Sequence, residues 1–243
     1  MLYAPATEQE QFNPSIASRL SNAYHQWFEI MQADTPILRE EVYRLRYQVY
    51  CCENQFENPD EHLQQLEMDV FDNRSIHSLI VERSSGAAIG TVRLILPEMA
   101  NPKASLPIQQ ICSHPLPASM PLSNSAEISR FAISKTMKRM ADGDMPKELK
   151  CSIVLGLMRA IVQMSLEHGI TDWLAVMEPS LLRLLSRFGI CFAPLGPLVS
   201  YHGMRQPCHA NVGRMLERTH QEHFDLWEFV TESGDSWSVE EAC

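Results

Sequence analysis

The sequence predicts a mixed α/β domain with a central sheet flanked by helices. Amphipathic helical segments alternate along the chain with short apolar runs of strand length. The stretch from 126 to 177 reads strand, helix, strand, as two parallel strands joined by a helix do. The 243 residues, 45% hydrophobic and 21% charged, suit one large globular domain or two small ones.

Two helices and three strands are expected before residue 97. Asn13-Pro14 and Asp34-Thr35-Pro36 each mark a helix start, because a capping residue precedes a proline that suits the first helical turn. A short strand is expected between these helices, at 28–33. Residues 75–83 and 87–96 are expected to form two further strands joined by a turn.

A proline-rich segment opens the second part of the chain. Residues 97–121 contain six prolines and little periodicity, so we expect a long loop there. The tail after Arg205 is weakly patterned. We expect strands at 126–134, 173–177 and 190–193, and helices at 150–168 and 179–188, each helix ending at a glycine.

Charge and composition exclude several classes of protein. The formal net charge is −10, whereas a nucleic-acid binder is normally basic, so no nucleic-acid partner is expected. No apolar stretch reaches the roughly 20 residues of a membrane-spanning helix, and the acidic N-terminus does not resemble a secretory signal. Seven cysteines without paired zinc-site spacing are interpreted as reduced thiols. We therefore expect a cytoplasmic protein with no transmembrane segment and no metal site.

Charged residues interrupt apolar segments at three places. Glu67, Asp69 and Asp72 lie within one short segment, where like charges raise one another's pKa unless cations or donors compensate. Arg93 lies inside an apolar strand, where a guanidinium faces solvent or needs a carboxylate partner.

The third place is the strand with Glu127 and Arg130. A regular strand would put these two residues on opposite faces, but a β-bulge between them would bring both to one face. The simplest interpretation of all three places is structural ion pairs or solvated edges. The alternative is one network, in which the three carboxylates face Arg93 and the Glu127–Arg130 pair closes it. Such a network could bind an amine and accept its proton.

Two family resemblances rest on these residues. The ordered motifs resemble the acyl-homoserine-lactone synthases of the GNAT acyltransferase superfamily. Four longer segments resemble the PEP-CTERM/exosortase system-associated acyltransferases, relatives of long-chain N-acyl amino acid synthases. The first set is Arg46, Glu67-x-Asp69-x-x-Asp72, Gly90-Thr91-Val92-Arg93-Leu94 and Glu127-x-x-Arg130-Phe131; the second is 46–51, 128–135, 178–185 and 201–207.

The resemblance implies a GNAT fold, with the pantetheine arm of an acyl thioester between two splayed parallel strands, here 126–134 and 173–177. It implies a GNAT-like domain at 28–207, with a helical extension at 1–27 and an acidic tail at 208–243. The implied activity moves a long fatty acyl group from acyl-carrier protein or acyl-CoA to an amine, above all the amino group of an amino acid. No cofactor beyond the acyl thioester is expected. An acyl-homoserine-lactone-type synthase and a non-catalytic acyl-binding module are the alternatives.

The resemblance also implies roles for single residues. Glu67 is the first candidate base and Glu127 the second. The basic residues near the donor favour an acidic acyl-carrier protein over free CoA. The implied catalytic set is Glu67, Asp69, Asp72, Arg93 and Glu127, the acceptor set Arg46, Tyr50 and Phe56, and the donor set Arg130, Phe131, Lys135, Lys138 and Arg139. A cysteine nucleophile from Cys51-Cys52 or Cys208-His209 is the weaker alternative, because buried inert cysteine is the default.

Overall fold

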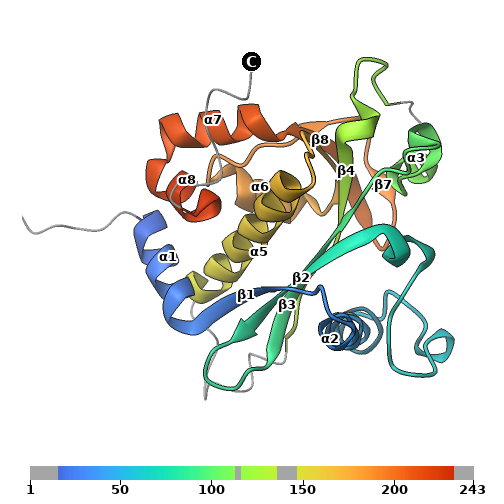
Figure 1. Ribbon diagram of the computed structural model, residues 1–243, viewed down its shortest axis with the longest axis horizontal. Coiled ribbons are helices and arrows are strands. Elements are labelled where there is room, and N and C mark those ends of the chain that lie inside the picture. Colours follow the sequence, from blue (N-terminus) through green and yellow to red (C-terminus); the bar gives the residue numbers. More distant parts are fainter. Residues whose placement is uncertain (1–15, 113–115, 136–146, 233–243) are drawn as a thin grey trace, which may run out of the picture.

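A single mixed sheet runs through the computed structural model, which describes residues 16–112, 116–135 and 147–232 (Figure 1). Its strands lie in the order β1-β2-β3-β4-β5-β8-β6, and the short β7 pairs with β8. Only β4 and β5 pair in parallel; the other pairs in the described residues are antiparallel. The strands are β1 Phe28–Gln32, β2 Ser75–Glu82, β3 Ala88–Ile95, β4 Ser125–Ile133, β5 Asp172–Met177, β6 Ala193–Pro194, β7 Val199–Ser200 and β8 Met204–Asn211.

Helices cover both faces of the sheet. α1, α5 and α8 pack together on one face, and α2 covers the other (Figure 1). α2 begins as the sequence predicts, because Thr35 caps it by accepting a hydrogen bond from the Leu38 N–H and Pro36 follows the cap. The helices are α1 Ile16–Trp27, α2 Pro36–Tyr47, α3 Ile108–Ile111, α5 Lys147–Glu167, α6 Pro179–Ser186, α7 Val212–Glu222 and α8 Phe224–Thr231.

α5 is the central core helix. Ile153, Leu157 and Ile161 of its predicted apolar stripe are fully buried against the sheet. The part from Leu149 to Glu167 is long and apolar enough to cross a membrane by length and composition, but 72% of it is buried inside the fold. Burial in the core accounts for its apolar character.

Most of the predicted elements form within two or three residues of their expected bounds. The strand expected at 190–193 forms instead at Ala193–Pro194. The larger difference lies at the C-terminal end, because a boundary after 207 would cut through β8, whose residues Gln206 to Asn211 pair with β5. β8, α7 and α8 therefore belong to the main domain, and the expected tail 208–243 is wrong as far as Glu232. Polar residues within β8, such as His209, hide its strand pattern in the sequence.

The parallel strands β4 and β5 diverge at one point. They pair only over Ser125–Ile128 on β4. Just beyond, the β3–β4 register shifts, so that Arg130 and Phe131 together stand opposite Val92. Arg130 has the left-handed φ of +50° that such an extra residue often needs. A β-bulge is therefore present, but at Arg130 and Phe131 rather than between Glu127 and Arg130, and the second half of β4 leaves a gap beside β5.

Close packing of α1 on α5 yields a stability prediction. A Cβ added at Gly156 of α5 would lie 2.4 Å from a ring carbon of Tyr24 on α1. Gly156→Ala is expected to lower the free energy of unfolding by about 1–3 kcal/mol in urea denaturation, because the helices must move apart. Gly90→Ala is the matched control, since its nearest neighbour would be 3.4 Å away. Equal stability of the two variants would show that α1 does not pack here.

Candidate active site

A buried arginine anchors the charged cluster. Arg46 lies in the last turn of α2 and has no exposed surface. Its Nε donates to Glu67 Oε2 at 2.5 Å, and its two Nη atoms donate to the carboxylate of Asp72 at 2.7 and 3.2 Å. All three of its donor atoms are therefore used, and two carboxylates are held side by side.

Local backbone bonds fix the acidic segment in place. The Glu67 N–H donates to the Tyr43 carbonyl of α2 at 3.1 Å. Asp69 caps the short helical turn Val70–Arg74 by accepting from the Phe71 N–H, and Asp72 accepts in return from the Asp69 N–H. This reciprocal capping explains the spacing Asp69-x-x-Asp72, since each carboxylate satisfies an N–H at the start of the turn.

Two arginines from the sheet complete the cluster. Arg93 of β3 donates to Asp69 at 2.6 Å, to Asp72 at 2.8 Å and to the Ser129 hydroxyl at 2.8 Å. Arg130, at the bulge, donates to Glu67 at 2.9 Å and to Asp69 at 3.3 Å. The predicted network thus forms in part: Arg93 and Arg130 face the three carboxylates, Arg46 is an additional member, and Glu127 makes no ion pair with it.

Three arginines face three carboxylates in this cluster, and the pairing fixes their protonation. Burial alone would raise the pKa of Glu67, but the guanidiniums of Arg46 and Arg130 lower it to about 2. Arg46 and Arg93 likewise hold the pKa of Asp72 well below its usual range against the effect of burial. These carboxylates stay ionised and paired at neutral pH, so they are poor proton acceptors.

Glu127 is a buried carboxyl that takes no part in these ion pairs. It is 3% exposed, and no cation in the described part of the chain lies within ion-pair distance of it. Its Oε2 accepts one hydrogen bond from the Ile108 N–H at 2.7 Å. Burial raises the pKa of Glu127 to about 8, with the Ile108 hydrogen bond and Arg93 opposing the shift. A carboxyl in this state exchanges a proton near neutral pH.

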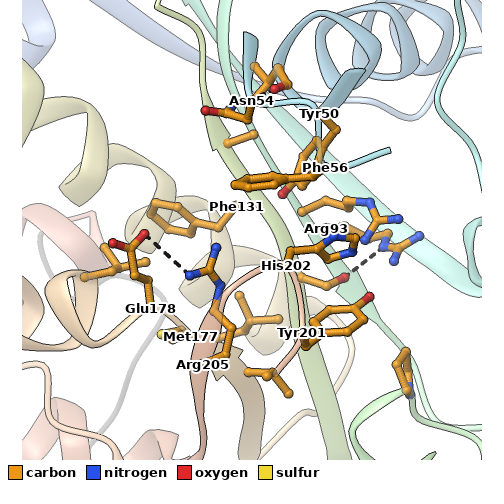
Figure 2. A pocket seen from close by; sticks show the side chains of 18 of the residues that line it. Tyr50, Asn54, Phe56, Arg93, Phe131, Met177, Glu178, Tyr201, His202 and Arg205 are labelled. Carbon is orange, nitrogen blue, oxygen red and sulfur yellow. Dashed lines mark hydrogen bonds and ion pairs between the residues drawn. The ribbon is translucent and has the colours of Figure 1, made fainter. Parts of the chain in front are cut away.

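A pocket of about 370 Å³ fills the gap between the diverging strands. Glu127 and Arg93 lie in its wall, as do residues 128–133 of β4 and the end of β5. Figure 2 shows aromatic side chains around it, among them Tyr50, Phe56 and Phe131. Arg46, Glu67 and Asp72 do not line this pocket. They support its wall from behind.

A second hollow of about 820 Å³ lies along the proline-rich loop. Its described lining runs from Pro102 to Ser123 and contains no aspartate, glutamate or histidine. Its titratable lining residues are Lys103 and Cys112, whereas the first pocket contains the buried carboxyl of Glu127, so we place the candidate active site in the first pocket.

Comparisons with known proteins agree with this geometry. Residues 45–143 match the family described as "Acetyltransferase (GNAT) domain". TofI in a ternary complex with an inhibitor and MTA aligns over 82% of this chain and 95% of its own, with a TM-score of 0.59 and 20% identity. The chain has the GNAT fold. No curated protein matches the sequence.

Two further solved structures align over most of their length. BjaI, a CoA-dependent acyl-homoserine lactone synthase solved with SAM and isopentyl-CoA, covers 80% of this chain and 88% of its own, with a TM-score of 0.56 and 20% identity. FeeM, an N-acyl amino acid synthase from uncultured soil microbes, aligns over 81% of this chain and 97% of its own, with a TM-score of 0.54 and 15% identity. The expected fold class, with its splayed parallel strands, is confirmed.

Some of the predicted site residues line the pocket between β4 and β5, and others do not. Lys135 lines it, and its Nζ donates to Asn54 Oδ1 at 2.6 Å. Lys138 and Arg139 lie outside the described residues. Lining residues predicted from the sequence are Tyr50, Phe56, Asp69, Arg93, Glu127, Arg130, Phe131 and Lys135.

Sequence reasoning assigned no role to several residues of the site. Tyr201, His202 and Arg205 line the pocket from the β7–β8 hairpin. The only signal for them was the family-like segment 201–207. His77 of β2 is buried 3.6 Å from Asp72, and burial lowers its pKa to about 4, so its imidazole is neutral at neutral pH. Nothing in the sequence around His77 indicates that its side chain lies beside Asp72.

The two buried thiols among the candidate nucleophiles, Cys51 and Cys208, are held protonated. Burial raises the pKa of Cys208 to about 12 and that of Cys51 to about 11, which leaves little thiolate at neutral pH. Among the residues that the structure describes, no group of three histidine, cysteine or acidic side chains could hold a metal ion. The pocket therefore offers Glu127 as its distinctive titratable group.

The unpaired Glu127 gives an unusual dependence of stability on pH. Its folded pKa of about 8 lies above the ordinary 4.5, so ionisation opposes folding increasingly as pH rises from 4.5 to 8. Glu127→Gln removes this penalty and keeps an acceptor for the Ile108 N–H. We expect urea denaturation to show the variant more stable than the wild type at pH 9, by on the order of 2 kcal/mol, and nearly equal at pH 5.

The control for this comparison is Glu98→Gln, at an exposed carboxyl. It is expected to leave the pH dependence unchanged. A constant stability difference between Glu127→Gln and the wild type from pH 5 to 9 would contradict the assignment.

Proposed function

We propose that this protein is an N-acyltransferase that moves a long fatty acyl group from an acyl-carrier protein or acyl-CoA thioester to the amino group of an amino acid. One observation carries the proposal: Glu127, a buried carboxyl with a raised pKa, stands where β4 and β5 part. Aminolysis of a thioester requires a group that accepts the proton of the attacking amine, and Glu127 places such a group at the gap between the splayed strands.

The gap supplies a place for an extended donor arm. β4 loses its strand partner on the β5 side after Ile128, so the backbone of 129–133 on that edge faces the pocket. An amide-containing arm such as pantetheine can pair with this edge as a strand would. Phe131 and Met177 add apolar surface beside it.

The reaction needs no covalent acyl-enzyme. A neutral amine attacks the thioester carbonyl carbon, forming a C–N bond and a tetrahedral oxyanion. Glu127 takes the proton that the nitrogen loses, directly or through a water, and backbone N–H groups at the bulge stabilise the oxyanion. The C–S bond then breaks, and the thiolate leaves with a proton returned from Glu127.

The ion-pair cluster acts as a scaffold in this proposal. Arg93 donates to Ser129, two residues from Glu127 on the same strand, and Arg130 holds the bulge against Glu67. The base is therefore Glu127 rather than Glu67, because Glu67 is ion-paired to two arginines and lies behind the pocket wall. Asp69 and Arg93 reach the pocket and supply its local field.

The finer parts of the proposal rest on the sequence. The basic residues after β4, Lys135, Lys138 and Arg139, suit an acidic acyl-carrier protein as donor. The segments at 178–185 and 201–207 support a role in a PEP-CTERM/exosortase system. The cysteines, interpreted as reduced thiols, support a cytoplasmic location. The structural likeness to BjaI keeps an acyl-homoserine-lactone synthase as the second candidate.

Product analysis by mass spectrometry tests this function. The purified protein is offered acyl-carrier proteins and acyl-CoAs of several chain lengths, with mixed amino acids and S-adenosylmethionine. The proposal predicts a long-chain N-acyl amino acid. An acyl lactone would select the second candidate, and donor binding without any product would contradict acyl transfer.

Replacing each of the two candidate bases with glutamine tests the mechanism. Glu127→Gln is expected to lower kcat about 100-fold or more. It should also abolish the rise of wild-type kcat with pH up to about 8, where the base becomes ionised. Initial rates across pH 6 to 10 measure both effects.

Glu67→Gln is the comparison variant. It is expected to lower the free energy of unfolding by about 3–5 kcal/mol, because it leaves buried arginine charge unpaired. Measured at a temperature where it is folded, it should keep the wild-type pH profile. Loss of that profile in Glu67→Gln, with Glu127→Gln unaffected, would reverse the assignment of the base.

A further inference from the structure

The cations in the pocket wall differ in how fully they are paired. Arg93 and Arg130 are bound to carboxylates at 2.6–2.9 Å. The Lys135 ammonium donates to Asn54 Oδ1 and to the Glu53 carbonyl. Neither the Lys135 ammonium nor the Arg205 guanidinium donates a hydrogen bond to a carboxylate of the described residues. Arg205 has only a long ion pair, 3.8 Å from its Nη1 to Glu178 Oε2, whose side chain is exposed.

The fold nevertheless fixes Arg205 firmly in the pocket. It lies at the start of β8, where it pairs with Val199 of β7 across a tight hairpin. His202 and Gly203 form the turn with left-handed φ values of +49° and +95°. The guanidinium lies 5.9 Å from the centre of the Phe56 ring, which belongs to the opposite wall. Figure 2 shows it directed inward between Phe131 and His202.

We propose that Arg205 binds the carboxylate of the acceptor amino acid. The proposal rests on the acyl transfer proposed above and adds that the acceptor must carry a carboxylate. A guanidinium with free donors binds a carboxylate through two parallel hydrogen bonds, which fixes the orientation as well as the position of the ligand.

The position of Arg205 relative to Glu127 suits this role. Glu127 stands opposite Leu174 of β5, and Gln206 stands opposite Met177, three residues or roughly 10 Å further along the strand. Arg205 is partly exposed and Glu127 is buried, so the two residues line the pocket at different depths. An amino acid between them places its amine toward the base and its carboxylate toward the guanidinium.

The other anion that a transferase must hold is the phosphate of the donor arm. The basic residues for it follow β4, at Lys135 and beyond, whereas Arg205 lies on β8 on the other side of the gap. Glu178 beside Arg205 also lowers the local positive charge, which suits a small zwitterion better than a phosphate.

Calorimetry and kinetics on the full chain test the proposal. Binding of each of the twenty amino acids is measured without donor, and the tightest is compared with its decarboxylated amine. We expect the amine to bind roughly 10- to 100-fold more weakly. In Arg205→Gln the amino acid should fall to the affinity of the amine and KM for the acceptor should rise by the same factor, with KM for the donor unchanged. Arg205→Lys should restore part of the affinity.

Arg183→Gln, at an exposed arginine of α6, is the matched control and should behave as wild type. Equal binding of amino acid and amine, no binding of any amino acid, or a rise in KM for the donor alone in Arg205→Gln would overturn the proposal. Binding that depends on Arg205 without any turnover would instead contradict acyl transfer and leave the carboxylate site standing. Turnover with a KM for the acceptor that does not change in Arg205→Gln would contradict the carboxylate site and leave acyl transfer standing.

Discussion

The balance of three arginines against three carboxylates is the constraint on which the site depends. Arg46, Arg93 and Arg130 satisfy Glu67, Asp69 and Asp72, and Arg46, Glu67 and Asp72 are buried behind the pocket wall. Removing one partner would leave a buried charge, so the cluster is held together as a unit. The same pairing leaves Glu127 without a cation, and burial then raises its pKa into the range where it can exchange protons.

The β-bulge connects this electrostatic arrangement to the shape of the pocket. It turns Arg130 toward the carboxylates and at the same time bends β4 away from β5. One irregular residue pair therefore both completes the ion-pair cluster and opens the gap. The left-handed φ of Arg130, costly for a residue with a side chain, is held by its bonds to Glu67 and Asp69.

Local signals in the sequence predict several elements of the fold and part of the candidate site. Capping residues, apolar periodicity and turns located α2, β2 and β3, and the odd spacing of Glu127 and Arg130 indicated a bulge in β4. The C-terminal strand β8 was missed, because its alternation is broken by polar residues that pair across the sheet. The ranking of Glu67 above Glu127 as candidate base also followed from sequence. Only three-dimensional contacts show that two arginines bind Glu67 and none binds Glu127.

The central claim is that an acyl thioester lies between β4 and β5 with its carbonyl beside Glu127. The most direct measurement is a crystal structure with a long-chain acyl-pantetheine analogue in which a stable linkage replaces the thioester. The arm is predicted to lie along residues 129–133, with the acyl carbonyl carbon within hydrogen-bonding reach of Glu127, directly or through one water. An analogue bound in the hollow of the proline-rich loop, or in the gap but with its carbonyl remote from Glu127, would contradict the claim.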